Sequence, residues 1–76
     1  MDNIFFERVD MAEWFPGATG RYLRALDRDS LELEAEISLT ADEFWSLPGD
    51  TFDDDELEDE SILERILTEY SERQGD

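Results

Sequence analysis

The chain of 76 residues contains no cysteine, no histidine and no lysine. Without cysteine it can form no disulfide, which favours a reducing compartment. The usual pairs of nucleophile and general base cannot be built without histidine, cysteine or lysine, and a histidine-based zinc site is excluded. We therefore expect a protein that is not an enzyme, with no catalytic residue and no cofactor.

Long hydrophobic runs are also absent, because the longest purely apolar stretches are only a few residues. Such runs are too short to span a membrane. The amino-terminal sequence MDNIFFE lacks the basic region and the apolar core of a signal peptide. We expect a cytoplasmic protein with a single acidic domain over residues 1–76, frayed at 73–76.

Positive charge is scarce. Six arginines face 23 aspartates and glutamates, which gives a net charge of −17. Such a charge repels nucleic acid and anionic membranes and attracts basic surfaces. High net charge is one sign of disorder, but the other sign, low hydrophobicity, is missing, since 39% of the residues are hydrophobic and 12% are aromatic. The composition therefore predicts a folded domain that has a basic protein as its partner and makes no direct contact with nucleic acid or membrane.

Strand signals occupy the first half of the chain. Residues Ile4–Val9 are apolar and aromatic, which is typical of a short strand. Residues Ser30–Leu39 alternate apolar side chains with glutamate or serine, which predicts a strand with one wet face. Residues Arg21–Leu26 fit either a hairpin partner that turns at Asp27–Asp29 or a short helix, and the hairpin is favoured. The predicted buried face of the strand consists of Leu31, Leu33, Ala35, Ile37 and Leu39.

Three stretches have the spacing of a helix-opening capping box, namely Asp10–Glu13, Thr40–Glu43 and Ser61–Glu64. The first predicts one helical turn that carries Trp14 and Phe15. The second predicts a short helix over Phe44, Trp45 and Leu47 that stops at Pro48.

A last helix is expected within Asp54–Arg73, with a restart or kink at Ser61. Its predicted apolar face consists of Ile62, Leu63, Ile66, Leu67 and Tyr70. The predicted fold is a small α+β domain, in which an antiparallel hairpin or meander packs against a short helix and a C-terminal amphipathic acidic helix.

The acidic segment, Asp50–Glu60, is acidic at eight of eleven positions. Acids complement the dipole of a helix N-terminus, so part of this segment could be a solvated helix start. If the helix began near Asp54, however, like charges four residues apart would cost roughly 1–2 kcal/mol together. A solvated face and a recognition surface therefore both remain open.

A second row of acids favours recognition. Glu32, Glu34 and Glu36 are expected on one face of the predicted strand, where alternate residues lie about 6.6 Å apart. An ordinary solubilising face would mix charges of both signs. The candidate partner-binding surface consists of Glu32, Glu34, Glu36, Asp50, Asp53, Asp54, Asp55, Glu56, Glu58, Asp59, Glu60 and Glu64.

No dedicated metal site is expected. An EF-hand loop needs an oxygen ligand at its fifth position and glycine at its sixth. In a loop that starts at Asp53 these positions are Leu57 and Glu58, and a start at Asp50 also fails.

The aromatic side chains are expected mainly in the core. An exposed one could act as a binding hot spot, and Trp45 is the candidate. The aromatic residues in question are Phe5, Phe6, Trp14, Phe15, Phe44, Trp45 and Phe52.

In size, acidity and the two carboxylate rows, at Glu32/Glu34/Glu36 and Asp53–Glu60, the chain resembles phage-encoded DNA-mimic inhibitors of the anti-CRISPR type. The resemblance rests on composition and charge layout over the whole chain, and no motif carries it. It implies an inhibitor that occupies the basic nucleic-acid channel of a host defence complex, such as a CRISPR surveillance complex, and blocks target DNA.

Two other functions fit the same charge. One is an immunity or antitoxin-like protein that masks the basic active site of a toxin or nuclease. The other is an acidic regulatory or adaptor domain whose terminal helix is the interface. Displacement of the partner by duplex DNA distinguishes a DNA mimic from an antitoxin-like protein.

Overall fold

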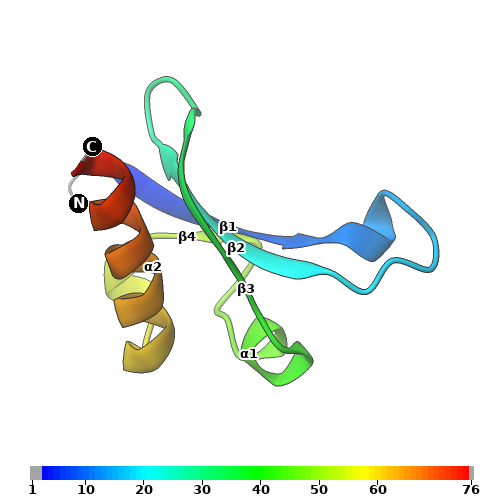
Figure 1. The fold of residues 1–76 in the computed structure, drawn as a ribbon. Coiled ribbons are helices and arrows are strands. Elements are labelled where there is room, and N and C mark those ends of the chain that lie inside the picture. Colours follow the sequence, from blue (N-terminus) through cyan, green and yellow to red (C-terminus); the bar gives the residue numbers. More distant parts are fainter. Residues whose placement is uncertain (1–2, 76) are drawn as a thin grey trace.

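A computed structural model describes residues 3–75 and contains a sheet, two helices and two short 3₁₀ turns (Figure 1). The strands are β1 (Ile4–Asp10), β2 (Arg21–Asp27), β3 (Leu33–Ser38) and β4 (Thr51–Phe52). The helices are α1 (Ala41–Trp45) and α2 (Glu60–Gln74), and the 3₁₀ turns are η1 (Met11–Glu13) and η2 (Asp54–Glu56).

The sheet has the strand order β3-β2-β1-β4, and all of its pairings are antiparallel. Strands β1, β2 and β3 form a meander, and the short β4 joins the outer edge of β1. The long helix α2 packs against the sheet and the short α1 lies at one end of it (Figure 1). The prediction of a small α+β domain with a C-terminal helix is confirmed.

The core lies between the sheet and α2. Its most completely buried large side chains are Phe6, Leu23, Ile62 and Ile66, which come from β1, β2 and α2. Leu63 and Tyr70 pack against this cluster from the edge of the helix. Four of the five residues of the expected apolar face therefore lie on the face that α2 buries, whereas Leu67 is half-buried and outside this cluster.

The β2–β3 hairpin turns where the sequence predicted. The Asp27 carboxylate accepts hydrogen bonds from the backbone N–H groups of Asp29 (2.9 Å) and Ser30 (3.0 Å). Leu31 follows with a φ of 62°, in the left-handed region. This conformation costs energy for a branched side chain, and it places Leu31 outside the strand.

Strand β3 departs from the predicted alternation in its first half. A register irregularity pairs Leu26 with Leu33 directly after Ala25 with Ala35, so Glu34 is an extra residue in β3. Leu31 is 64% exposed and Leu33 is 44% exposed. The prediction that both are buried is wrong, whereas Ala35, Leu39 and the partly buried Ile37 do belong to the core.

Helix α1 begins as its sequence predicted. The Thr40 hydroxyl accepts the Glu43 N–H at 3.2 Å, and the Glu43 carboxylate accepts the Thr40 N–H at 2.9 Å. This reciprocal pair is a capping box. The helix ends at Trp45, ahead of Pro48.

The last helix begins later than predicted. Residues from Asp54 form the 3₁₀ turn η2, Leu57 is extended and buried, and α2 starts only at Glu60. The Asp59 carboxylate caps it by accepting the N–H groups of Ser61 (3.0 Å) and Ile62 (3.3 Å). The expected restart at Ser61 is therefore a start at Glu60, and the costly helical run of like charges does not form.

At its other end α2 extends to Gln74, so Arg73 and Gln74 lie within the helix. The expected fraying of 73–76 stays a prediction. Asp76 lies outside the described residues. Within residues 3–75, no helix has both the length and the apolar character needed to cross a membrane.

The capping role of Asp59 predicts a specific loss of stability. Asp59→Ala leaves two N–H groups of α2 without a side-chain acceptor and should lower the free energy of unfolding by about 1 kcal/mol. Asp59→Asn removes the same charge but keeps the acceptor, and should lower it by only a few tenths of a kcal/mol. Urea unfolding of both variants measures the difference, and equal losses would contradict the cap.

Candidate functional site

Five of the six arginines form ion pairs with acids of the described chain, and four of these pairs join elements that are distant in sequence. The exception is Arg73–Glu69, which lies within α2. The pairs are Arg8–Asp50 (3.1 Å), Arg24–Glu36 (2.7 Å), Arg65–Glu43 (2.8 Å), Arg73–Glu69 (3.2 Å) and Arg28–Asp53. The scarce positive charge is thus used inside the fold.

Four members of the acidic segment have structural partners. Asp50 pairs with Arg8 and Asp53 with Arg28. The Glu56 carboxylate accepts the N–H of Asp53 at 3.2 Å, and Asp59 caps α2. These acids hold η2 and the start of α2 in place, so part of their capacity to accept hydrogen bonds is used within the fold before any partner binds.

Five other acids, all between Asp54 and Glu64, make no ion pair or side-chain hydrogen bond with residues 3–75. We call them the free acids. Asp54 is half-buried, and the other four are exposed. The free acids are Asp54, Asp55, Glu58, Glu60 and Glu64.

The predicted row on β3 does not form an open array of carboxylates. Glu32 precedes the strand, Glu34 accepts a hydrogen bond from Gln74 at 2.8 Å, and Glu36 pairs with Arg24. Gln74 ends α2, whereas the acidic segment leads into its first turn. Because a helix of this length spans roughly 20 Å, the two acidic rows lie apart. The structure therefore does not bring all the predicted site residues together.

One group of carboxylates within residues 3–75 could hold a cation. Oxygens of Asp53, Asp55 and Glu56 lie within 4.8 Å of one another. Asp55 and Glu56 are exposed, and Asp53 is already paired with Arg28. The group therefore carries no argument for a metal site.

Two carboxylates are perturbed by the fold. Backbone N–H groups of Ser30 and Asp29 donate to Asp27 and hold its pKa below the ordinary value. The Thr40 N–H, assisted by the Arg65 guanidinium and opposed by partial burial, lowers the pKa of Glu43. Both carboxylates act in turns and caps, so the shifts report structural roles.

The aromatic residues are less buried than the sequence suggested. Phe6, Phe44 and Phe52 belong to the core, and Phe5 is half-buried. Trp14 is 71% exposed and Phe15 is 61% exposed, so their assignment to the core is wrong. Trp45, the one candidate for an exposed hot spot, is 64% exposed.

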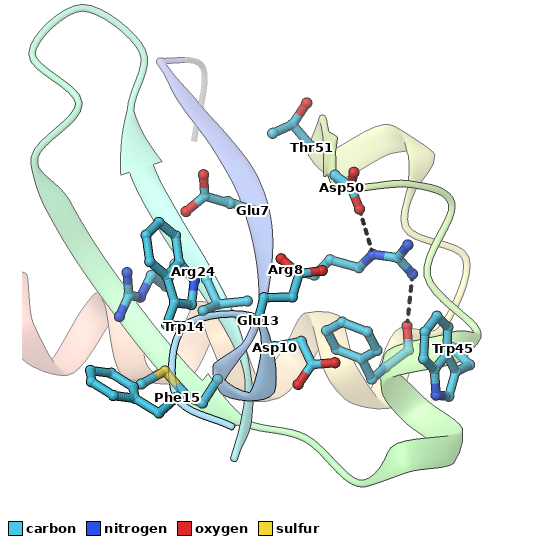
Figure 2. Close-up of a pocket in the computed structure, with 13 residues that line it drawn as sticks. Glu7, Arg8, Asp10, Glu13, Trp14, Phe15, Arg24, Trp45, Asp50 and Thr51 are labelled. Atoms are coloured by element: carbon cyan, nitrogen blue, oxygen red, sulfur yellow. Dashed lines mark hydrogen bonds and ion pairs between the residues drawn. The ribbon is translucent and has the colours of Figure 1, made fainter. Parts of the chain in front are cut away.

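These three exposed aromatics line one groove (Figure 2). Trp14 and Phe15 follow η1 on one side, Trp45 ends α1 on the other, and β1 runs between them. We call this site the aromatic groove. Its lining includes three acids that make no ion pair within the described chain, namely Glu7, Asp10 and Glu13.

Arg8 fixes one wall of the groove. Its Nε donates to Asp50 at 3.1 Å and its Nη1 donates to the Phe44 carbonyl at 3.3 Å. The guanidinium carbon lies 4.8 Å from the Phe44 ring centroid and 5.5 Å from that of Trp45. One side chain therefore joins β1 to the end of α1 and to the start of β4 (Figure 2).

Sequence reasoning missed most of this groove. The available signal was the position of Trp14 and Phe15 directly before Pro16-Gly17, in a segment with no periodic pattern to bury them. The three acids of the groove are spaced along β1 and η1, and only the path of the chain brings them near the aromatics.

No protein-family model, curated protein or solved structure matches the chain. The candidate binding surfaces are the free acids and the aromatic groove.

The lowered pKa of Glu43 predicts a pH dependence of stability. Because the folded pKa is below the unfolded one, the contribution of Glu43 is complete above about pH 4.3 and is lost as the pH falls through the folded pKa. Glu43→Gln should therefore be less stable than Glu72→Gln at pH 7, and this gap should close below about pH 4. Urea unfolding from pH 7 to pH 3 measures the gap, and Glu72 is a matched control because it is exposed and removes the same charge. A gap that stays constant down to pH 3 would show that Glu43 acts by packing alone.

Proposed function

We propose that the protein is an acidic DNA-mimic inhibitor that occupies the basic nucleic-acid-binding surface of another protein or complex and keeps nucleic acid out. The chemistry of such surfaces supports the proposal. Nucleic-acid channels bind backbone phosphates through lysine and arginine, largely without reading sequence. Carboxylates held in place on a folded surface compete for the same donors.

One observation carries the proposal: five of the six arginines are paired internally while the free acids are not. A surface made only for solubility would interleave both charges. Here Arg28 and Arg8 are bound to Asp53 and Asp50, and the turn and helix start that follow expose carboxylates alone. Electrostatic attraction of this kind speeds association with a basic partner and weakens as salt rises.

The class of partner follows from the same charge. A defence complex with a positively charged channel for nucleic acid, such as a CRISPR surveillance complex, has the complementary surface. Because the second acidic row is internally paired at Glu36 and Glu34, the proposed contact is centred on the free acids.

An antitoxin-like role uses the same surface against a different target. In that case the carboxylates would cover the basic active site of a toxin or nuclease. The clustering of the free acids in one short stretch, Asp54–Glu64, fits a compact basic site as well as a channel.

A pull-down separates these two functions. The full chain is immobilised and exposed to bacterial lysate, and bound protein is eluted first with duplex DNA and then with salt. A partner released by duplex DNA supports the DNA mimic. A partner that resists DNA and leaves with salt supports the antitoxin-like role, and binding that salt does not weaken contradicts both.

Charge-neutral variants test the surface itself. Asp55→Asn, Glu58→Gln and Glu60→Gln together remove three free acids and spare the acids that hold the fold. Three exposed charge pairs at 0.2–1 kcal/mol each predict a loss of affinity of about tenfold, with a shallower salt dependence. Circular dichroism should show an unchanged fold.

The matched control removes three charges elsewhere, by Asp29→Asn, Asp42→Asn and Glu72→Gln. It has the same net charge as the test variant, so it separates a local contact from general attraction. Equal losses in the two variants would mean that the free acids are not the contact.

A further inference from the structure

We propose that the aromatic groove is the anchoring site for a basic peptide segment of the partner, and that an arginine side chain of that segment packs against Trp45. This inference deepens the proposed function and rests on it in one respect, that the partner is basic. The groove would be a second contact with the partner, separate from the free acids, and an arginine side chain of the partner would bind there.

Exposed aromatic rings gather in the groove. Trp14, Phe15 and Trp45 are three of the five large hydrophobic side chains that the described chain exposes, and all three line one groove. Aromatic side chains gathered at one site are typical of binding hot spots. The faces of tryptophan rings also attract cations, and arginine most often.

Acids outnumber arginines in the lining of the groove. The two arginines that line it are both neutralised, Arg8 by Asp50 and Arg24 by Glu36. Its three other charged side chains, Glu7, Asp10 and Glu13, are all acidic. The Asp10 carboxylate accepts only the N–H of Ala12 among the described residues, at 3.0 Å, so it keeps acceptor capacity. The groove therefore combines aromatic faces with an excess of acids over arginines, although Glu7 and Asp10 stand opposite Arg24 and Arg21 in the β1–β2 register.

Arg8 shows that this wall suits a guanidinium. Its side chain is only 18% exposed, lies over Phe44 and Trp45 and donates to a carboxylate. An arginine from outside would make the same two interactions, with the exposed part of Trp45 and with Asp10 or Glu13. Planar stacking and forked donors favour arginine over lysine in such a setting.

The edge of β1 favours an extended segment as the occupant. Strand β4 pairs with β1 only at Phe6 and Glu7, followed by the bond from the Arg8 N–H to the Asp50 carbonyl at 2.9 Å. Alternate residues of a strand direct their backbone N–H and C=O groups to the same side. The backbone groups of Asp10, like those of Arg8, therefore face this edge, beyond the end of β4. A peptide could add there as a short strand while its arginine enters the groove.

A second copy of the chain is a poor occupant, because it also has a net charge of −17. Nucleic acid, whose bases also stack on tryptophan, is repelled by the same charge. A basic polypeptide is the occupant whose charge complements the groove.

The two tryptophans of the chain both line the groove, so their fluorescence reports on it directly. The probe is a nine-residue peptide of alternating arginine and glycine, titrated into the full chain at about 0.15 M salt. We expect a saturable change in tryptophan emission. The matching lysine–glycine peptide should bind severalfold more weakly, because its ammonium groups lack the planar stacking. No change with the arginine peptide would overturn the proposal.

Variants separate the groove from the general acidity of the chain. Trp45→Ala should weaken binding of the arginine peptide about threefold to tenfold in calorimetry, as expected for the loss of a cation–π contact. Leu31→Ala is the matched control, since Leu31 has the same 64% exposure as Trp45 and lies outside the groove. Equal affinities in these two variants would overturn the groove as the site. Because Trp45 is largely exposed, the variant should fold, and Glu13→Gln tests the acidic part with no loss of aromatic surface.

The groove and the proposed function can fail separately. The variant with Asp55, Glu58 and Glu60 neutralised should keep the fluorescence response to the peptide while it loses competition with DNA for the partner. If the partner still binds Trp45→Ala at full affinity, the groove is not the anchor, whatever the free acids do. A change in emission with protein concentration alone would indicate a second copy in the groove and would also overturn the proposal.

Discussion

The pairing of four arginines with acids from distant parts of the chain is the interaction on which the rest of the structure depends. Arg24 ties β2 to β3, Arg65 ties α2 to α1, and Arg28 ties the β2–β3 turn to η2. Arg8 joins β1 to α1 and to Asp50. A 76-residue domain buries a small core, so its elements need such connections to keep their positions. Each pair at the surface contributes little alone, and their value here lies in fixing where the short elements sit.

This use of positive charge decides where negative charge is exposed. Once Asp50, Asp53 and Glu36 are paired, five of the acids that remain open lie from Asp54 to Glu64, and three others line the aromatic groove. The chain limits their mutual repulsion by its local structure. Because α2 starts at Glu60, Glu60–Glu64 is the one pair of like charges from this region that lies within the helix, and the acids before it lie in a 3₁₀ turn and an extended stretch. The turn is held by Arg28 and Glu56, so the repulsion is opposed by specific bonds and the surface stays ordered.

The sequence predicted those features whose cause is local. Alternation predicted the hairpin, the Thr40–Glu43 box predicted α1, and the 3.6-residue period predicted the buried face of α2. The errors arose where the arrangement of elements in the fold overrode the local sequence preference. Leu33 is exposed because an extra residue shifts the register of β3, and Trp14 is exposed because no element of the described chain covers η1. The start of α2 was misplaced because burial of Leu57 requires an extended backbone, which a run of acids does not reveal. The groove could not be predicted, since it depends on the β1 edge that the short β4 leaves open.

The two surfaces of the proposed complex would differ in what they contribute. Charge attracts over several ångströms and sets the rate and salt dependence of association, but a row of flexible carboxylates fixes orientation poorly. Rigid aromatic side chains lose little conformational entropy on binding and fix one geometry. Asp50 connects the two surfaces, since it begins the acidic segment and also holds Arg8 against Trp45. A partner that contacts both would therefore meet carboxylates and aromatic rings in a fixed relative position, set by the single arginine between them.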